Sequence, residues 1–297
     1  MTQVNSAPAW RAKVVSQAKV SSPRVLVYAP PGTGKTTLVA SVPKVLILDW
    51  DRGADQTSAH RIPGPSTWTE SLQLVRDISS DPSGYQALAI DTVDPLEEMC
   101  ARHVCEQAKK PTIADFGFGA GYEALAAEWR QLLLALDACR AKGMTIILLG
   151  HSTVRQVQDP QLGQYDSYLP QLQKKTWAIT SRWCDVVAFA NFDAARVEDE
   201  RRAIVTGERV LYTTRGSGFE AKNRYGLPAK MKLSWEALDA GIRAGQVSAE
   251  EMRARITQMA AGTEYADKAA TYLADAGEDV ARLQAIENAL RAKIQSV

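Results

Sequence analysis

The residues whose types and spacing best suit chemistry form one run, APPGTGKTT, at positions 29–37. The run follows an apolar stretch typical of a strand and precedes a helical pattern, so its backbone N–H groups can wrap around a phosphate. Gly32 and Gly34 allow the close approach that such a loop needs, and Lys35 can reach the β- and γ-phosphates. The sequence therefore predicts an ATP site that consists of Pro31, Gly32, Thr33, Gly34, Lys35, Thr36 and Thr37.

Thr36 and Asp91 are the residues that we predict to bind Mg²⁺ at this site. Asp91 ends the apolar run 87–91, so a buried strand would deliver its carboxylate to the carboxyl edge of a sheet. An aspartate in this place holds Mg²⁺ in P-loop proteins, whereas an aspartate after a strand is by itself most often a turn former. The phosphate loop two strands earlier favours the metal interpretation.

Hydrolysis also requires a group that orients the attacking water, and two aspartates follow another apolar run. Asp49 and Asp51 stand in the sequence LDWDRG at positions 48–53. A general base must lie within hydrogen-bond reach of its water. The alternative is that both carboxylates only cap the end of the strand.

Short runs rich in Val, Ile and Leu alternate with helical patterns along the first two thirds of the chain. We expect strands at 24–29, 45–50, 87–91, 145–150 and 186–190, and helices at 35–42, 68–79, 95–108 and 122–141. Such continuous apolar runs are typical of strands that are buried on both faces of a parallel sheet. The pattern predicts an α/β fold with a mainly parallel central sheet and right-handed crossovers.

The remaining third of the chain has a different texture. The segments 186–192 and 202–213 are expected to add antiparallel strands to the sheet. From residue 235 onward the sequence is rich in Ala, Glu, Arg and Leu, with a capping box at Ser248 and Glu251. We expect a core domain over residues 1–234 and a small helical C-terminal appendage over residues 235–297.

Composition excludes several classes of protein. With 297 residues, of which 45% are hydrophobic and 23% charged, the chain can bury a large core and is not expected to be disordered. Four cysteines are too few for a disulfide scaffold, and no apolar run is long enough to span a membrane. We therefore expect a soluble cytoplasmic protein with no membrane partner. The formal net charge of +1 argues against a basic coat over the whole surface, but bases outnumber acids between residues 196 and 232.

The motifs resemble those of the RecA family of recombination ATPases. In that family a catalytic glutamate lies two residues beyond an aspartate at the strand end, and on this spacing the resemblance gives Asp51 the catalytic place. Asp is one methylene shorter than Glu, which implies slow hydrolysis or none. The strand end LLGHS at 148–152 matches the place of a γ-phosphate sensor, usually Gln, so the resemblance implies that His151 has this role.

The segment AKNRYGLP at 221–228 looks like the KNRFG motif of bacterial RadA and the paired cations of ring helicases. In those families Lys and Arg reach across a subunit boundary to the neighbour's γ-phosphate. The resemblance thus implies a catalytic role in trans for Lys222 and Arg224, and a homo-oligomer that is a ring or a filament. The alternative is a solvated basic turn.

Two polar loops with aromatic residues follow the relevant elements, at 111–122 and 153–175. Aromatic faces and a few cations suffice for sequence-tolerant binding of single-stranded nucleic acid. The second loop matches the position of a DNA-binding loop of the RecA family. The candidate DNA contacts are Arg155, Tyr165, Tyr168, Lys174 and Lys175, although such loops are equally often lids or partner surfaces.

Taken together, the motifs between about residues 24 and 232 resemble phage-encoded RecA/RadA-like ATPases described as single-strand annealing proteins. The resemblance implies an oligomeric ATPase that uses Mg²⁺ and ATP, binds single-stranded DNA and promotes annealing or recombination in the host cytoplasm. One alternative is a nucleotide-gated helicase loader or replication accessory protein, with residues 235–297 as its partner surface. Another is a hexameric helicase-like motor.

Overall fold

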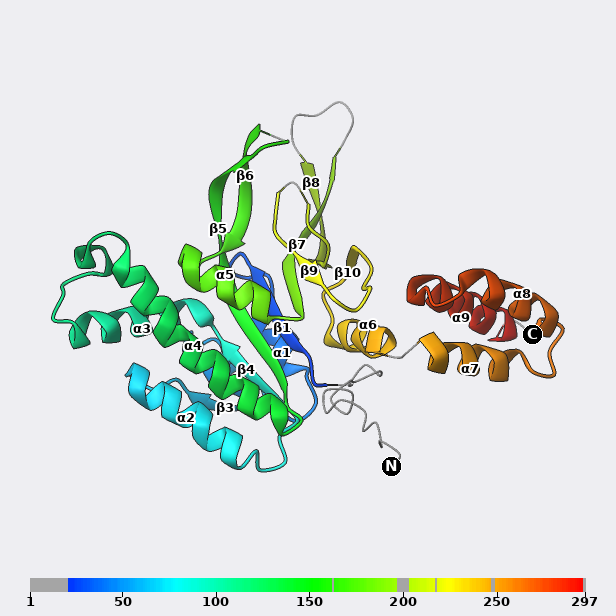
Figure 1. The fold of residues 1–297 in the computed structure, drawn as a ribbon, viewed down its shortest axis with the longest axis horizontal. Helices are drawn as coiled ribbons and strands as arrows, with labels where there is room; N and C mark the ends of the chain where they lie inside the picture. The colour runs from blue at the N-terminus through cyan, green and yellow to red at the C-terminus, as the bar shows by residue number, and fades with distance from the viewer. Residues whose placement is uncertain (1–20, 162, 197–202, 217, 247–248, 296–297) are drawn as a thin grey trace, which may run out of the picture. The chain divides into compact units, whose positions relative to one another are not determined.

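The structure, a computed structural model, describes residues 21–161, 163–196, 203–216, 218–246 and 249–295 (Figure 1). These residues form two compact units, one from Ser21 to Ile242 and one that begins at Arg243. We describe each unit by itself.

The first unit is built on a mostly parallel sheet with antiparallel additions. Its strands are β1 (Arg24–Ala29), β2 (Val45–Asp49), β3 (His60–Pro63), β4 (Ala87–Asp91), β5 (Thr145–Asp159), β6 (Gly163–Pro170), β7 (Val186–Arg196), β8 (Ala203–Tyr212), β9 (Lys222–Asn223) and β10 (Lys230–Lys232). The order across the sheet is β10-β8-β7-β1-β5-β4-β2-β3, with β6 paired to β5 and β9 paired to β7. Strands β6, β8, β9 and β10 join by antiparallel pairing, which confirms the predicted antiparallel extension.

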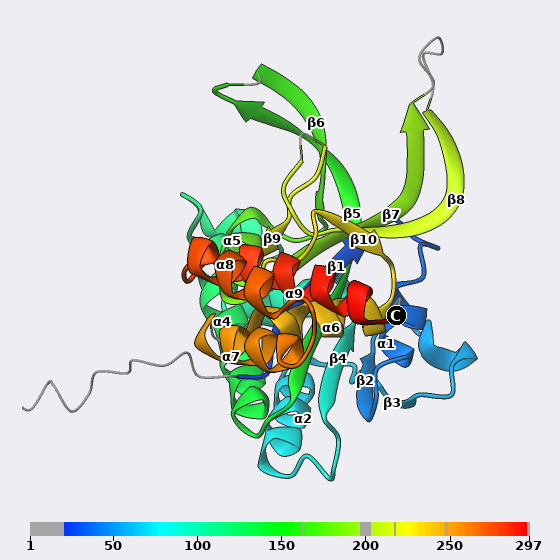
Figure 2. The same cartoon turned by 90° about the vertical axis from the view of Figure 1, so that its right-hand side faces the viewer.

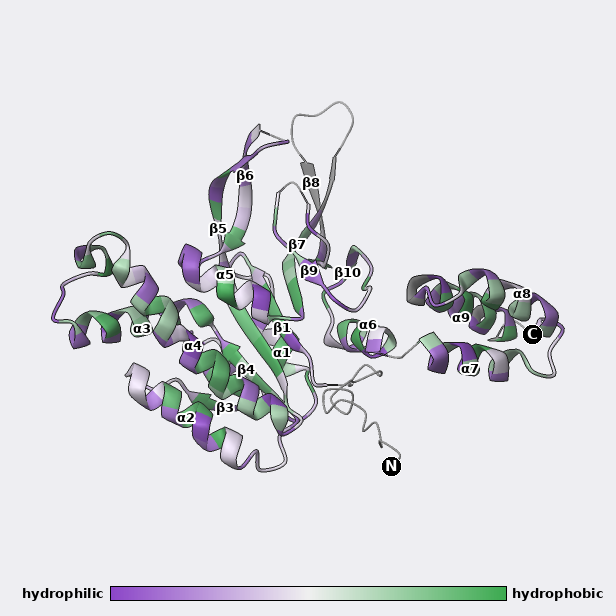
Figure 3. Cartoon of the chain, in the orientation of Figure 1, coloured by the Kyte–Doolittle hydropathy of each residue, from purple (hydrophilic) through white to green (hydrophobic). Residues whose placement is uncertain are grey.

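Helices cover both faces of this sheet. They are α1 (Lys35–Ala40), α2 (Trp68–Ser80), α3 (Val93–Gln107), α4 (Ala120–Ala141), α5 (Lys174–Trp183) and α6 (Trp235–Gln246). Helices α2 to α5 bury apolar side chains against one face, and α1 and α6 pack on the other. Alternate residues of β1 enter the two cores, Leu26 on the first face and Val27 on the second, so the strand is apolar throughout. The central strands are accordingly green in Figure 3.

Two hairpins continue beyond the sheet past the last residue of β1, one formed by β5 and β6 and the other by β7 and β8 (Figures 1 and 2). The expectation of a loop at 153–175 is therefore wrong. These residues complete β5, form β6 and begin α5. The strand expected at 145–150 is shorter than β5 because the rest of β5 is mostly polar and lacks a continuous apolar run. Along this part, side-chain exposure alternates from residue to residue, as in a strand that pairs in a hairpin, and the partner is β6.

The second unit contains α7 (Ala249–Ala260), α8 (Ala266–Ala276) and α9 (Val280–Gln295). Its own core includes Met252, Ile256, Leu273 and Leu283. The division between the units falls after Ile242 and differs from the expected boundary at residue 234, because the start of α6 packs into the core beneath the sheet. Ser248 of the predicted capping box lies outside the described residues. Within the part of the chain that the structure describes, no helix is both long and apolar enough to cross a membrane.

Candidate functional site

The phosphate-loop motif forms the turn between β1 and α1. Gly32 and Gly34 have φ angles of 76° and 101°, in the left-handed region that favours glycine. The hydroxyl of Thr33 donates to the carbonyl of Pro30 at 2.8 Å and closes the turn. Because β1 lies between β5 and β7, the loop emerges at the centre of the sheet. We call the end of the parallel strands at which it lies the carboxyl edge, and the opposite end the amino edge.

Lys35 is 6% exposed at the start of α1. Its Nζ lies 3.3 Å from the carbonyl oxygen of Ala29 and 3.4 Å from that of Pro30. Burial lowers the pKa of Lys35, and the charge of Asp91 opposes that effect. The ammonium therefore has long contacts to neutral carbonyls in a place where a phosphate oxygen would be a better partner.

Thr36 and Asp91 meet as predicted, with the hydroxyl of Thr36 donating to Oδ2 of Asp91 at 2.6 Å. Asp49 stands beside Asp91 in the register of β2 and β4, and its Oδ2 accepts from the backbone N–H of Ala54 at 3.1 Å. The Oδ1 atoms of both aspartates are buried and have no hydrogen-bond partner among the described residues. Burial raises the pKa of Asp91 to about 6, although the hydrogen bond from Thr36 lowers it.

This donor set fits Mg²⁺. The ion prefers hard oxygen ligands and keeps several waters, and unpartnered buried carboxylate oxygens are costly unless something binds them. The hydroxyl of Thr36 and the carboxylate of Asp91 are the groups that would hold the ion. Asp49, which stands opposite Asp91 in the register of β2 and β4, adds a second carboxylate at this edge.

His151 connects two acidic residues at the same edge. Its Nδ1 lies 2.7 Å from Oδ2 of Asp94, and its Nε2 lies 3.6 Å from Oδ2 of Asp51. The backbone N–H of His151 also donates to Oδ1 of Asp94 at 3.0 Å. The hydrogen bond to Asp94 raises the pKa of His151, while burial acts in the opposite direction. The structure thus brings the predicted base and the predicted sensor together.

Asp94 is a residue that the sequence analysis missed. Burial alone would raise the pKa of its carboxyl, but the hydrogen bonds from His151 outweigh it, and the pKa is lowered. An ionised carboxylate can only accept, so it orients the ring with the proton on Nδ1 and with Nε2 toward Asp51. Nothing local marks Asp94, because an acid in the first turn of a helix is common.

Helix α3 fixes both ends of the β5–β6 segment. Asp94 accepts a hydrogen bond from the backbone N–H of His151, where the segment begins. Glu97, one helical turn later, accepts from the backbone N–H of Gln173 at 3.0 Å, where the segment ends. The hydroxyl of Thr176 also donates to Glu97. Burial raises the pKa of Glu97 to about 7. Because α3 follows directly from Asp91, the predicted metal ligand and the hairpin share one rigid support.

The five predicted DNA contacts have separate surroundings. Tyr168 stacks on Phe189 with ring centroids 4.9 Å apart, and Arg155 donates to the carbonyl of Leu172 at 3.0 Å. Lys175 pairs with Glu123, Tyr165 lies close to Arg215, and Lys174 is exposed. Tyr168 therefore contributes to packing at the base of the hairpin.

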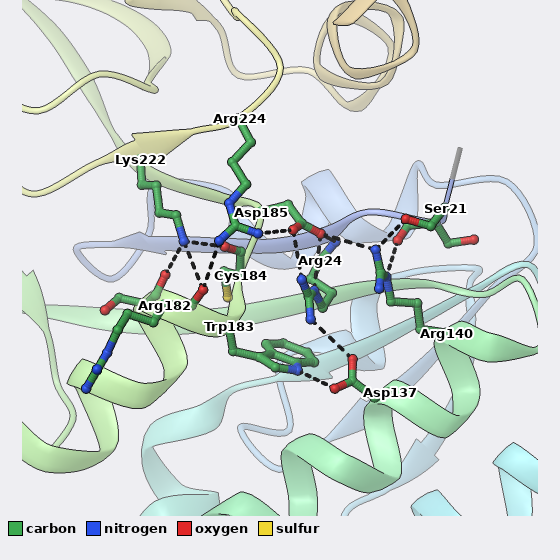
Figure 4. A network of polar contacts seen from close by, with 12 residues as sticks. Ser21, Arg24, Asp137, Arg140, Arg182, Trp183, Cys184, Asp185, Lys222 and Arg224 are labelled. Atoms are coloured by element: carbon green, nitrogen blue, oxygen red, sulfur yellow. Dashed lines mark hydrogen bonds and ion pairs between the residues drawn. The ribbon is translucent and has the colours of Figure 1, made fainter. Parts of the chain in front are cut away.

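Lys222 and Arg224 lie at the amino edge (Figure 4). The ammonium of Lys222 donates to the carbonyls at the end of α5, those of Ser181, Arg182 and Cys184, at 2.8, 3.0 and 2.7 Å. Arg224 donates through Nη1 to Oδ1 of Asp185 at 3.0 Å, and Asp185 accepts from the backbone N–H of Arg24 at the start of β1. The structure does not bring these cations to the phosphate loop of their own chain. Their action on a neighbour's nucleotide stays a prediction.

Residues 21–225 match the family described as AAA domain. No curated protein matches the chain. A solved structure titled "Crystal structure of the RadB recombinase" is similar at 14% identity and a TM-score of 0.38, over 65% of this chain and 81% of that chain. At this level the likeness says nothing about function.

Proposed function

The chain belongs to the AAA domain family, and from that premise we propose that it is a Mg²⁺-dependent ATPase. The observation that carries the proposal is the meeting of Lys35, Thr36 and Asp91 at the carboxyl edge, where a buried carboxylate oxygen has no partner. Phosphate and a hydrated cation are the ligands that complete such a site.

Each residue has a distinct task. Lys35 exchanges its long contacts to carbonyl oxygens for the β- and γ-phosphates. Thr36 and Asp91 would hold Mg²⁺, and the bound ion would supply positive charge for the phosphates. Asp51, whose side chain is 43% exposed, orients the attacking water, and the neighbouring His151 senses the γ-phosphate.

Substitutions at Lys35 and Asp51 test the ATPase by separating ATP binding from turnover. Lys35→Ala should abolish detectable ATP binding in calorimetry, because it removes the cation of the loop, whereas Lys110→Ala at an exposed position should bind like the parent. Asp51→Asn should still bind ATP but lose turnover. Asp51→Glu adds the methylene that the RecA family has and should raise the rate. Equal turnover of the parent and Asp51→Asn would contradict the role of Asp51.

We further propose that the ATPase acts on single-stranded DNA in annealing or recombination, as a homo-oligomer. What supports this is helix α3, which begins two residues after Asp91 and accepts hydrogen bonds from His151 within β5 and from Gln173, three residues beyond β6. Fluorescence anisotropy of a labelled oligonucleotide over a salt series, with ATP, with ADP and without nucleotide, is the test. Binding that does not depend on nucleotide would contradict the coupling.

A second candidate is a nucleotide-gated loader or accessory protein that holds a replication or recombination partner. The separate core of α7 to α9 favours it, together with an apolar groove on α8 and α9 where Tyr272 is 55% exposed. Under this alternative, Tyr272→Ala should weaken capture of a partner protein and leave ATP turnover and DNA binding unchanged.

A further inference from the structure

The β7–β8 hairpin passes beside the phosphate loop. Tyr28, next to the end of β1, pairs in register with Phe189, so residues further along β7 lie beyond the last residue of β1. Phe192 is one of them, and it stands opposite Arg209 in the antiparallel ladder of β7 and β8. The side chain of Arg209 therefore starts from a strand that extends past the loop.

Arg209 reaches the loop itself. A Cβ atom placed on Gly34 would lie only 2.9 Å from Nη1 of Arg209 and 3.7 Å from its Cζ. The guanidinium thus packs directly against the backbone at Gly34, the residue before Lys35. Gly34 is favoured there by its φ of 101°, and a side chain at this position would in addition shift the guanidinium of Arg209.

The surroundings of Arg209 leave its hydrogen-bond donors for a ligand. Its Cζ lies over the ring of Phe192, 5.6 Å from the ring centroid. Such a contact uses the face of the planar guanidinium, while the N–H groups point outward in its plane. No ion pair joins Arg209 to a carboxylate of the residues that the structure describes, in contrast to Arg24 and Arg224, which both pair with Asp185.

The charge balance of the loop calls for a second cation. Lys35 is surrounded by the charges of Asp91, Asp51 and Asp94. A nucleoside triphosphate adds further negative charge, which one buried ammonium balances only in part even with a divalent ion. Arg209 supplies positive charge from outside the acidic cluster, in the planar form that suits two phosphate oxygens at once.

From this geometry we propose that Arg209 binds phosphate oxygens of the nucleotide held in the phosphate loop of its own chain. The inference rests on the proposed ATPase function and deepens it, because it adds a phosphate contact in cis from the β7–β8 hairpin. The contact recognises the polyphosphate and not the base. It should therefore act on ATP and on inorganic tripolyphosphate alike.

Calorimetric titration of the full chain with ATP and with tripolyphosphate, both with Mg²⁺, tests the proposal. Arg209→Ala should lower the affinity for both ligands about tenfold or more, which is the effect expected from the loss of a charge-assisted hydrogen bond. Arg209→Lys keeps the charge but not the fork and should fall between the parent and Arg209→Ala. Arg130→Ala removes an exposed arginine from α4 and changes the net charge equally, so it should bind like the parent.

Failure of this inference and failure of the ATPase proposal give different results. If the parent binds ATP, Lys35→Ala does not, and Arg209→Ala stays within about twofold of the parent, the role of Arg209 is wrong and the ATPase stands. If Arg209→Ala lowers the affinity for ATP but not for tripolyphosphate, the proposal that Arg209 recognises the polyphosphate is wrong. If the parent binds neither ligand, both proposals fail.

Discussion

Asp91 and Asp185 are buried aspartates at opposite edges of the parallel sheet, and their surroundings shift their acidity in opposite directions. At the carboxyl edge, burial raises the pKa of Asp91 to about 6, and one of its carboxylate oxygens has no hydrogen-bond partner in the part of the chain that the structure describes. At the amino edge, burial would also raise the pKa of Asp185, but hydrogen bonds from Arg24 outweigh it and the pKa is lowered.

The two aspartates differ in the number of cationic and hydrogen-bonding groups that the chain places beside each carboxylate. Arg24, Arg140 and Arg224 lie at 2.9, 3.8 and 3.0 Å from the carboxylate of Asp185, so its charge is compensated within the protein (Figure 4). Among the residues that the structure describes, the hydroxyl of Thr36 is the only hydrogen-bond donor to the carboxylate of Asp91. A buried charge is stable when it is paired, so the amino edge is complete as folded, whereas the carboxyl edge keeps an unpaired carboxylate oxygen, which is what the proposed ligand site requires.

Neutralising Asp185 should have the largest effect on stability. Asp185→Asn leaves several guanidinium groups without their shared acceptor and should lower the free energy of unfolding by about 3 kcal/mol in denaturant titration at pH 7. Asp137→Asn is the matched control, because Asp137 also pairs with Arg24 but is 37% exposed, and it should cost less than about 1 kcal/mol.

The effect of Asp185 should depend on pH. The pKa of Asp185 is lower in the folded protein than in the unfolded chain. Its contribution to the free energy of unfolding is therefore fully present above the ordinary pKa of 3.8 and is lost as the pH falls through the pKa of the folded state. The parent and Asp185→Asn should therefore converge in stability in strong acid. ATP affinity at pH 7 should be equal in both, and a large loss of affinity would show that the two edges are not independent.

Glu97 should show the opposite pH dependence. Burial raises its pKa from 4.5 to about 7. Its contribution to stability is therefore present below about pH 4.5 and is lost as the pH rises through about 7. Glu97→Gln stays neutral and should gain about 2 kcal/mol relative to the parent between pH 5 and pH 8, as measured by urea unfolding at each pH.

A second variant keeps the Glu97 experiment informative. Thr176→Val removes a hydrogen bond that favours the charged form of Glu97. The free energy of unfolding of this variant should therefore fall more than that of the parent as the pH rises to alkaline values. A flat difference between Glu97→Gln and the parent across this pH range would contradict the assignment.

Among the substitutions at Asp185, Glu97 and Lys222, Lys222→Ala should have the smallest effect on stability. It removes the cation that caps the last carbonyls of α5 and should cost about 1 kcal/mol in thermal or urea unfolding. If the contacts at the amino edge are its whole role, ATP turnover per chain should be unchanged. That result would contradict the predicted action on a neighbour's nucleotide.

A mixing experiment decides this case directly. Lys35→Ala chains cannot bind ATP but carry an intact Lys222, whereas Lys222→Ala chains carry an intact phosphate loop. If Lys222 acts across a subunit boundary, the mixture should recover turnover that neither variant has alone. Arg224→Ala, which removes a side chain that is 51% exposed, can be mixed in the same way.

Local pattern was enough to predict much of the fold. The runs that became β1 and β4 match their predicted bounds, because strands buried on both faces are apolar at every position. The polar half of β5, together with β6, was not predicted as strand. The polar half of β5 pairs with β6, and its strand conformation depends on this pairing and not on burial between two layers of helices.

The candidate site divides in the same way. The sequence by itself determined the phosphate loop and the meeting of Thr36 with Asp91, because glycine spacing and strand ends are local features that parallel topology brings to one edge. Only the tertiary structure decided that Asp94 orients His151, that Lys222 caps α5, and that Arg209 lies against Gly34. These contacts join residues that are 57, 41 and 175 positions apart in the chain. No periodicity encodes such pairs, since they depend on which strands lie side by side and on how far each one extends.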